Sequence, residues 1–594
     1  MNDDLIPDSD SIHSTSLQFT SRSPRRRLPS RNSTVSRQSR ADSDVSDIVA
    51  PIPRRHHLLQ RSDSQWLHSQ VSHRFSRPVS PTASLASETL SKRNQMSSFS
   101  AVIENKALTK SPQELYGWGR KWIRWMHHNG MRLYVIPCII LGAALVKWSV
   151  GLGSYSGYRT PPTYGDYEAQ RHWLEITTNL PIRQWYTYDL QYWGLDYPPL
   201  TAYHSWMLGK LGACINPSWF VLDKSRGIET PDSKVYMRAT VLISDLLIYF
   251  PAVALFIRRF LNHRSGRTQP ALILIDSGHF QYNSVMLGLT LLCLDYLSIS
   301  SDLIAAVFFV LSLGFKQMAL YYAPAIGSYY LGKCLLLGVN EGWDSIFLSF
   351  DCCAEFPLCH SRRLFFRLGF TTLTVMAGLF IPWLFGSIKD PIARIFPFNR
   401  GLFEDKVANF WCASDVILKW RRWMGITALL RLSTLLTVIG FAPAAWGLIA
   451  NAWIISRKTQ GARVEKLESG FASSPTLALL PYALLTSSLS FFLFGFQVHE
   501  KSILLPLLPA TLILSGAESG GGGEDWEWGV LFNNTAFVYG GMAILHTAEA
   551  LFSPPARYPD IFPVLNVLLC ALVFVSVWLW SIKRGIEVGW ALTP

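Results

Sequence analysis

The sequence predicts an all-α polytopic membrane protein with about 12 to 14 transmembrane helices. Of its 594 residues, 49% are hydrophobic and only 16% are charged, a balance that ordinary soluble domains do not show. Apolar runs recur from residue 133 to residue 582, and many approach the length of about 20 residues that crosses the hydrocarbon core of a bilayer. The membrane region should therefore form most of the chain.

The first 132 residues have a different composition. They are rich in Ser, Arg and Pro and show no hydrophobic periodicity, so we predict a disordered, basic, cytosolic tail. This segment has 20 Lys and Arg against 11 Asp and Glu, which accounts for nine of the 13 excess positive charges of the chain. The net charge therefore does not indicate nucleic-acid binding by the membrane part. An arm that binds lipids or a partner is the alternative for the tail.

Basic residues predict how the helices are oriented. Lys and Arg gather on the cytosolic side of membrane proteins, and three of them lie between 120 and 124, just before the first apolar run at about 133–150. We therefore expect a cytosolic N-terminus and a lumenal loop at 151–235. Within this loop, the apolar stretch at 200–215 contains Lys210 and two glycines and is too short to span, so we expect an interfacial helix.

The remaining spans follow by alternation. The next one is expected near 238–257, because it would deliver the arginines that follow it to the cytosol. Continued alternation assigns a loop at 386–425 and a turn at 497–501 to the lumenal side and gives an even number of spans. Residues 133–594 are therefore expected to form one membrane domain after the 1–132 tail.

Four polar segments interrupt the apolar background. The first begins with Asp166, and further charged residues follow it on one helical face: Glu168, Arg171, His172 and Glu175. Carboxylates beside a membrane are costly unless they perform chemistry or bind cations. The alternative is a helix capped by Thr163 whose charges pair on a wet surface.

A second acid, Asp196, occurs later in the same loop. Pro198 and Pro199 follow it, and proline fixes its own φ and restricts the residue before it. This arrangement suits a preorganised carboxylate site.

The second polar segment, 274–285, lies between two apolar stretches and contains His279, Gln281 and Asn283. Polar groups in such a position must find a partner or face a cavity. A polar turn that joins two short membrane helices explains them equally well, so we interpret them as a structural polar cluster.

The third and fourth polar segments mix charges with aromatic residues. The third, 396–412, includes Glu404 and suits an amphipathic helix that either closes over a lipid-linked substrate or only anchors the loop. The fourth, 494–509, has His499 and Lys501 where one span ends and the next begins. These two side chains could neutralise a phosphate, although snorkelling would also explain Lys501.

At these segments the chain resembles a known family. Five stretches carry the resemblance: YGDYEAQRHW, LDYPPLTAYHSW, GHFQYNS, RGLFEDKVANFWC and FGFQVHEKSILLPLLP. They are similar to the endoplasmic-reticulum α-1,3-glucosyltransferases that use dolichyl-phosphate glucose to build the lipid-linked oligosaccharide for protein N-glycosylation. The first and fourth stretches look more like the members that add the first glucose to the nine-mannose oligosaccharide, whereas HFQYN and LDYPP are shared with the sister enzyme that adds the second.

The resemblance implies both a fold and a reaction. It implies a C-type glycosyltransferase fold in the endoplasmic-reticulum membrane, with a lumenal active site. It also implies inverting transfer from dolichyl-phosphate glucose to a dolichyl-diphosphate-linked oligosaccharide, with no cofactor and no metal, and it places the general base at Asp166. The nine cysteines form no CxxC pair and match no standard zinc spacing.

An inverting displacement is compatible with these assignments. One carboxylate must take the proton of the attacking hydroxyl, and positive charge must stabilise the departing phosphate. The candidates for phosphate contacts are His499, Lys501 and Arg171. The candidates for acceptor positioning or loop organisation are Asp196, Glu404 and Glu168.

A lipid or sugar transporter is the remote alternative. It predicts charges near the middle of the bilayer and internal sequence repeats. The charges of this chain lie at loop edges, and we find no convincing repeat. These features favour an enzyme.

Overall fold

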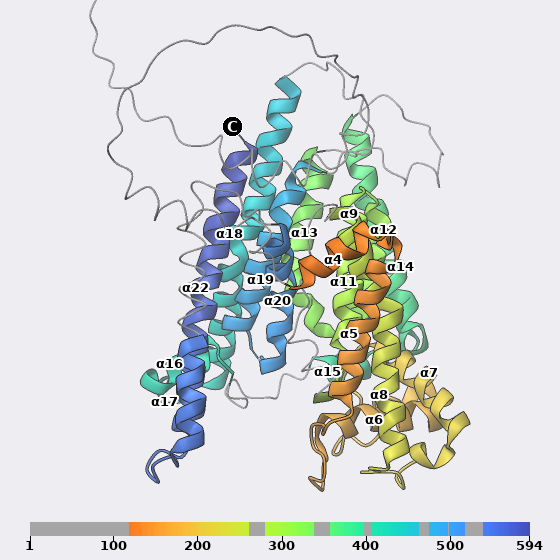
Figure 1. Ribbon diagram of the computed structural model, residues 1–594. Helices are drawn as coiled ribbons and strands as arrows, with labels where there is room; N and C mark the ends of the chain where they lie inside the picture. Colours follow the sequence, from red (N-terminus) through yellow and green to blue (C-terminus); the bar gives the residue numbers. More distant parts are fainter. Residues whose placement is uncertain are drawn as a thin grey trace, which may run out of the picture. The chain divides into compact units, whose positions relative to one another are not determined.

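The protein is a bundle of long apolar helices. Its computed structural model describes residues 118–260, 279–337, 357–396, 407–461, 474–496, 498–516 and 539–593, in which every regular element is a helix (Figure 1). Six of these helices are long and apolar enough to cross a membrane: Arg132–Gly151, Pro231–Arg259, Arg363–Leu384, Ile426–Lys458, Pro475–Phe494 and Ile561–Leu592. The prediction of an all-α polytopic membrane protein is confirmed, and the count of 12 to 14 spans stays a prediction.

The first two predicted spans coincide with helices that are long and apolar enough to cross a membrane. The first contains helix α5 (Val135–Gly151). The second is a continuous helical path of α8 (Pro231–Ser244), the π-helical turn η5 (Asp245–Tyr249) and α9 (Phe250–Phe260). Between them lie α6 (Gly165–Asn179) and α7 (Pro199–Ile215).

The second span begins at Pro231, earlier than the predicted start near 238. The Thr230 hydroxyl accepts a hydrogen bond from the Ser233 amide, and Pro231 suits the first helical position because it has no N–H to leave unpaired. These local signals extend the helix beyond the apolar run.

Helix α4 (Trp118–His128) lies inside the region predicted to be disordered. The prediction of disorder for 1–132 is therefore wrong from residue 118 onward, and residues 1–117 lie outside the described residues. Trp and Ile recur among Arg and Lys in this segment at helical spacing, which gives the helix an apolar side and a basic side. A basic composition alone does not reveal that periodicity.

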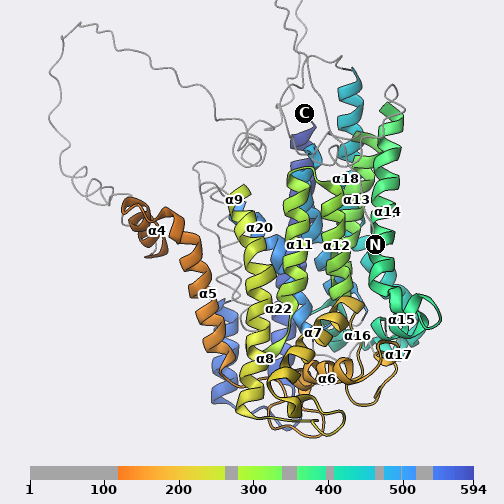
Figure 2. The same cartoon turned by 90° about the vertical axis from the view of Figure 1, so that its right-hand side faces the viewer.

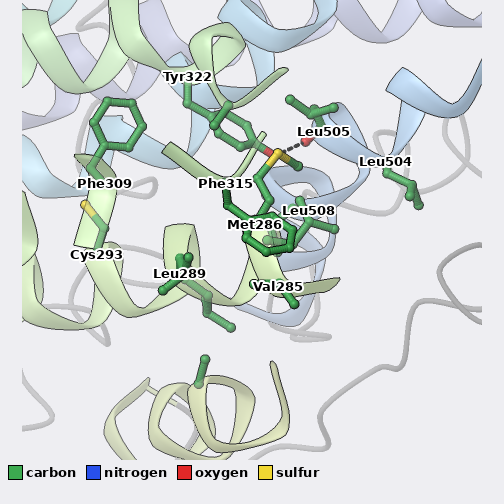
Figure 3. Close-up of a cluster of buried hydrophobic side chains, with 14 of the residues drawn as sticks. Val285, Met286, Leu289, Cys293, Phe309, Phe315, Tyr322, Leu504, Leu505 and Leu508 are labelled. Carbon is green, nitrogen blue, oxygen red and sulfur yellow. Dashed lines mark hydrogen bonds between the residues drawn. The ribbon is translucent and has the colours of Figure 1, made fainter. Parts of the chain in front are cut away.

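Helices α11 (Asn283–Ser298) and α12 (Asp302–Phe315) pack against each other in the buried core. Helices in a lipid environment are held by close packing and by hydrogen bonds between helices. The Thr290 and Ser312 hydroxyls lie 2.9 Å apart and join α11 to α12. Figure 3 shows a second link, in which the Tyr322 hydroxyl donates to the Leu505 carbonyl at 2.6 Å.

Tyr322 and Leu505 join two further elements of this core. Tyr322 ends a 3-10 turn that leads into α13 (Ala323–Gly332), and Leu505 belongs to α20 (Leu504–Gly516). Figure 3 shows their side chains beside Met286 and Phe315, so elements more than 180 residues apart share one apolar core.

The predicted helix at 200–215 is present as α7. Pro198 and Pro199 begin it, and four of its apolar side chains are exposed: Trp206, Met207, Leu211 and Ile215. An exposed apolar side on a helix too short to span is typical of interfacial helices, and the interfacial location stays a prediction.

The later helices bring a second group of short helices to the same end of the bundle. The long helices are α14 (Pro357–Leu384), α18 (Ile426–Gly461), α19 (Leu480–Phe494) and α22 (Ile561–Leu592). The short ones, α15 (Lys389–Ile395), α16 (Phe410–Leu418) and α17 (Trp420–Trp423), lie at the same end of the bundle as α6 and α7 (Figures 1 and 2). The described parts of the two predicted lumenal loops, 151–235 and 386–425, thus share one end.

Candidate active site

A tight backbone turn fixes Asp166 in the first turn of α6. Tyr164 and Gly165 both have positive φ, 55° and 65°, so the chain changes direction directly before Asp166. Gly157 lies so close to this turn that a Cβ at that position would overlap the Tyr164 carbonyl. Thr163 makes no capping hydrogen bond to the helix, so the alternative of a Thr163-capped helix is not observed.

Three donors converge on one oxygen of Asp166. Its Oδ2 lies 3.0 Å from His279 Nε2 and 2.7 Å from Gln281 Nε2, and it forms an ion pair with Lys501 Nζ. The four residues come from the first, second and fourth polar segments. The carboxylate keeps 29% of its side-chain surface exposed, so a substrate can reach it.

The backbone around Phe280 aims His279 and Gln281 at Asp166. Phe280 has a φ of 87°, which is rare and costly for a bulky residue, yet its ring is fully buried 4.9 Å from the Tyr167 ring. The His279 carbonyl also accepts a hydrogen bond from the Ser156 amide at 3.3 Å. Packing of Phe280 therefore holds a strained turn with its two polar neighbours directed at one carboxylate.

Opposing effects act on the pKa of Asp166. Burial raises the pKa, whereas the hydrogen bond from His279 and the positive charge of Lys501 lower it. The lowering effects are larger in sum, and they hold the pKa of Asp166 well below its ordinary value. Asp166 is therefore ionised at neutral pH.

A second layer of polar contacts surrounds Gln281. Its Oε1 accepts hydrogen bonds from Asn283 Nδ2 at 2.9 Å and from Lys316 Nζ at 3.2 Å. Lys316 also donates to Asn283 Oδ1 at 2.6 Å and lies 4.7 Å from the centre of the Tyr197 ring. The residues predicted as a structural polar cluster thus connect Asp166 to a buried lysine.

Arg171 does not fit the predicted role of a phosphate ligand. Its side chain is 1% exposed, and all five N–H donors are used within the protein: two by Glu168, one by Glu175, one by Ser225 and one by the Trp219 carbonyl. The charged face of α6 is turned inward rather than paired on a wet surface. No N–H group of Arg171 is left for a phosphate.

Glu168 and Glu175 complete this buried network. Glu168 Oε1 also accepts from the Gly227 amide at 3.0 Å and from the Tyr192 hydroxyl at 3.2 Å, and Glu175 Oε1 accepts from the Asp223 amide at 2.7 Å. Both acids therefore tie α6 to distant parts of the 151–235 loop, and Glu168 has the loop-organising geometry.

The chain is similar to known proteins over most of its length. The chain matches the family described as "ALG6, ALG8 glycosyltransferase family" over residues 143–538, which include Asp166 and the three residues that contact it. It belongs to this family. The family resemblance inferred from the sequence is therefore confirmed.

Similar members of the family come from fungi and animals. The "Dolichyl pyrophosphate Man9GlcNAc2 alpha-1,3-glucosyltransferase" of Saccharomyces cerevisiae is 39% identical over 546 residues, which cover 76% of this chain and 91% of that protein. The protein of the same name from Gallus gallus is 41% identical over 395 residues, covering 63% and 69%. A "Probable" enzyme of that name from Schizosaccharomyces pombe is 36% identical over 509 residues, covering 76% and 92%.

The remaining predicted site residues are Asp196, His499 and Glu404. The Asp196 carbonyl accepts a long hydrogen bond from Gln317 Nε2 at 3.4 Å, and Asp196 directly precedes Tyr197, which packs on Lys316. His499 is half-buried at the start of the turn that carries Lys501. Glu404 lies outside the described residues.

Lys316 is the residue that sequence reasoning missed. It follows the end of α12 in an apolar context and is 4% exposed. Its signal was present in the sequence, because a lone lysine between apolar stretches must find polar partners. What was missing was the identity of those partners, which lie 33 and 35 residues earlier in the chain.

Proposed function

We propose that this protein transfers glucose from dolichyl-phosphate glucose to the nine-mannose oligosaccharide on dolichyl diphosphate and forms an α-1,3 bond. The names of its relatives, which share 36–41% identity with it, support this acceptor and this bond. Transfer of the first glucose in lipid-linked oligosaccharide assembly is the corresponding step.

The reaction is an inverting displacement with Asp166 as general base. A hydroxyl of the terminal mannose attacks C1 of the β-linked glucose, the C1–O bond to the phosphate breaks, and its electron pair leaves on dolichyl phosphate. The hydroxyl proton passes to Asp166. A single carboxylate is sufficient because phosphate is a good leaving group that needs no general acid.

The observation that carries this proposal is the convergence of His279, Gln281 and Lys501 on Asp166. Together they keep the carboxylate ionised and fixed while part of its surface stays accessible. A group that must accept a proton benefits from such a fixed orientation. Neither a simple helix cap nor a surface ion pair requires three donors from two distant segments of the chain.

Lys501 and His499 are proposed to receive the donor phosphate. Lys501 already places a cation at Asp166, and His499 lies two residues before it on the same turn. A cation beside the leaving oxygen stabilises the charge that develops there. Asp196 and Glu404 are proposed to position the acceptor, and Glu168 to organise the loop.

The finer features of the fold are part of the same proposal. We assign a C-type glycosyltransferase fold with 12 to 14 membrane spans in the endoplasmic reticulum, a cytosolic N-terminus and a lumenal active site. Arg258 and Arg259 lie in the last turn of α9, and α6, which begins with Gly165 and Asp166, lies at the opposite end of that span (Figure 1). This arrangement supports the orientation.

Replacement of Asp166 tests the proposal. In purified enzyme reconstituted with dolichyl-phosphate glucose and the nine-mannose acceptor, Asp166→Asn should lower the transfer rate by about 10²- to 10⁴-fold, because general-base catalysis contributes that much. Asp223→Asn, an exposed acid of the same loop, is the matched control and should transfer glucose normally. Normal turnover by folded Asp166→Asn protein would overturn the proposal.

Acceptor choice tests the assigned step. The enzyme should glucosylate the nine-mannose oligosaccharide and not its singly glucosylated product. Activity on the singly glucosylated acceptor alone would instead identify the enzyme of the second glucose step.

A further inference from the structure

We infer that Lys316 and Asn283 are positioning residues that hold the Gln281 amide so that it donates to Oδ2 of Asp166 and leaves Oδ1 as the proton acceptor. This inference rests on the proposed function, in which Asp166 is the general base. It adds residues that do not touch the reacting atoms and act through Gln281.

The contact with Lys316 fixes the orientation of the Gln281 amide. A glutamine amide has an acceptor end and a donor end, and a lysine ammonium can only donate. Because Lys316 Nζ lies 3.2 Å from one end of the amide, that end must be the oxygen. The NH₂ group then faces Asp166 Oδ2, 2.7 Å away.

Lys316 also fixes the orientation of the Asn283 amide. Its Oδ1 faces the Lys316 ammonium at 2.6 Å, so its NH₂ group must face the Gln281 oxygen at 2.9 Å. The result is a chain of donors with one direction, from Lys316 through Asn283 and Gln281 to Asp166. The ammonium sets this direction because it is the one member that cannot reverse its donor role.

Lys316 is itself held rigidly. It is 4% exposed, it follows the C-terminal end of α12, where helix carbonyls favour positive charge, and its ammonium lies over the Tyr197 ring. Removal of this buried cation should therefore disturb the side chains that contact it, Gln281 and Asn283. Gln281 is the partner that touches Asp166.

The two carboxylate oxygens of Asp166 have different surroundings. Three donors converge on Oδ2, whereas none of the described residues donates to Oδ1. The carboxylate is therefore anchored through one oxygen and offers the other to the attacking hydroxyl. Loss of the Gln281 contact would let the carboxylate turn, and small misplacements of a base are costly to the rate.

The experiment compares Lys316→Met with Lys316→Arg in the reconstituted enzyme. Lys316→Met should lower kcat by about 10- to 100-fold, change the KM of each substrate by less than about 3-fold, and move the acid limb of the pH profile to higher pH. The limb moves because a hydrogen bond to the ionised carboxylate lowers its pKa, so loss of that bond raises it. Lys316→Arg should restore most of kcat, since arginine also donates.

A double-mutant cycle separates positioning from a general structural role. If Lys316 acts through Gln281, then Lys316→Met should have little further effect in a Gln281→Ala background, whereas independent effects would multiply. Lys333→Met is the matched control, because Lys333 is another buried lysine and pairs with Asp302 at the opposite end of α12. It should lower thermal stability and leave the pH profile of the folded fraction unchanged.

A second variant covers the case in which Lys316→Met does not fold. Asn283→Asp keeps an acceptor for Lys316 and turns an oxygen toward Gln281 Oε1, so it should disturb the amide and lower kcat in the same way. Normal kcat and an unchanged pH profile in these variants, or multiplicative effects in the cycle, would overturn the inference. Loss of activity in Asp166→Asn alongside those results would leave the proposed function standing, whereas full activity in Asp166→Asn would remove both.

Discussion

Asp166 stays ionised because two neighbours offset the effect of burial. Burial favours the neutral acid, and the hydrogen bond from His279 together with the charge of Lys501 favours the carboxylate. In the proposed reaction Lys501 has two roles. It holds Asp166 before the donor binds, and it can contact the phosphate of the donor afterwards. The activity of the enzyme should depend on pH through this pair.

Replacement of Lys501 should make that dependence visible. In the wild type the low pKa of Asp166 keeps the base ionised through the ordinary titration range of aspartate, so protonation of Asp166 does not limit activity there. In Lys501→Met the pKa rises, and kcat/KM should begin to fall at a higher pH as the solution is acidified. The exposed Lys224→Met variant is the control. An acid limb that stays in place in Lys501→Met would contradict the electrostatic account.

The charged side chains on the buried face of α6 hold the fold together and do not face the active site. The prediction from spacing placed Arg171, Glu168 and Glu175 on one face, which is correct, but spacing does not say whether that face meets solvent or protein. The structure turns it inward, and Arg171 becomes the centre of an ion-pair network. Its partners from the distant loop could not be predicted from local sequence.

Arg171→Met should therefore act on stability. Loss of one partner leaves two buried carboxylates uncompensated, a change that typically costs about 3–5 kcal/mol. Thermal unfolding in detergent, monitored by size-exclusion chromatography, measures the stability. The Arg171→Met variant should be clearly less stable than the exposed Arg183→Met variant. A raised KM for dolichyl-phosphate glucose with unchanged stability would instead return Arg171 to the phosphate site.

At the scale of elements, the first span is attached to the bundle by few side chains. Helix α5 buries only Val135, Ala144, Lys147 and Gly151. Lys147 forms an ion pair with Asp245 in the π-helical turn between α8 and α9, and both side chains are buried. A charge pair at this depth joins the first span to the second.

Removal of one charge from this pair should be more harmful than removal of both. Lys147→Met leaves Asp245 buried without its cation and should destabilise the protein by about 3–5 kcal/mol, whereas Lys147→Met with Asp245→Leu should recover much of that loss. Thermal unfolding in detergent measures both, with exposed Lys121→Met as the control. Equal instability of the single and double variants would show that the pair does not attach α5.

Element boundaries were predictable where local signals were strong. The first span and α7 were predicted to within a few residues, because the length of an apolar run is a local feature. The start of α8 was predicted too late, because its first turn is polar and an apolar pattern does not include it. The Thr230 cap begins the helix there nevertheless. Helix α4 was missed because the absence of hydrophobic periodicity was assigned to all of residues 1–132, whereas the segment 118–128 has a helical period of its own.

At the scale of the whole molecule, the proposed orientation places Asp166 in the lumen. Exposed Arg183 lies in the same loop as Asp166, and exposed Lys458 lies near the far end of α18. In a cysteine-free background, Lys458→Cys should react with an impermeant maleimide in sealed microsomes. Arg183→Cys should react after the membrane is permeabilised. The reverse pattern would invert the assigned topology.

The class of the protein, its first spans and the acid at the centre of the site can be read from the sequence alone. Apolar length, basic flanks and the residues around Asp166 in the stretch YGDYEAQRHW are local properties, and they persist in any fold of the chain. The residues that contact Asp166 depend on the folding of the whole chain, because His279, Gln281 and Lys501 lie 113, 115 and 335 residues away. The same folding buries Arg171 and places Lys316 against Gln281. Such contacts depend on how helices pack against one another, and a one-dimensional pattern of polarity contains no direct record of that packing.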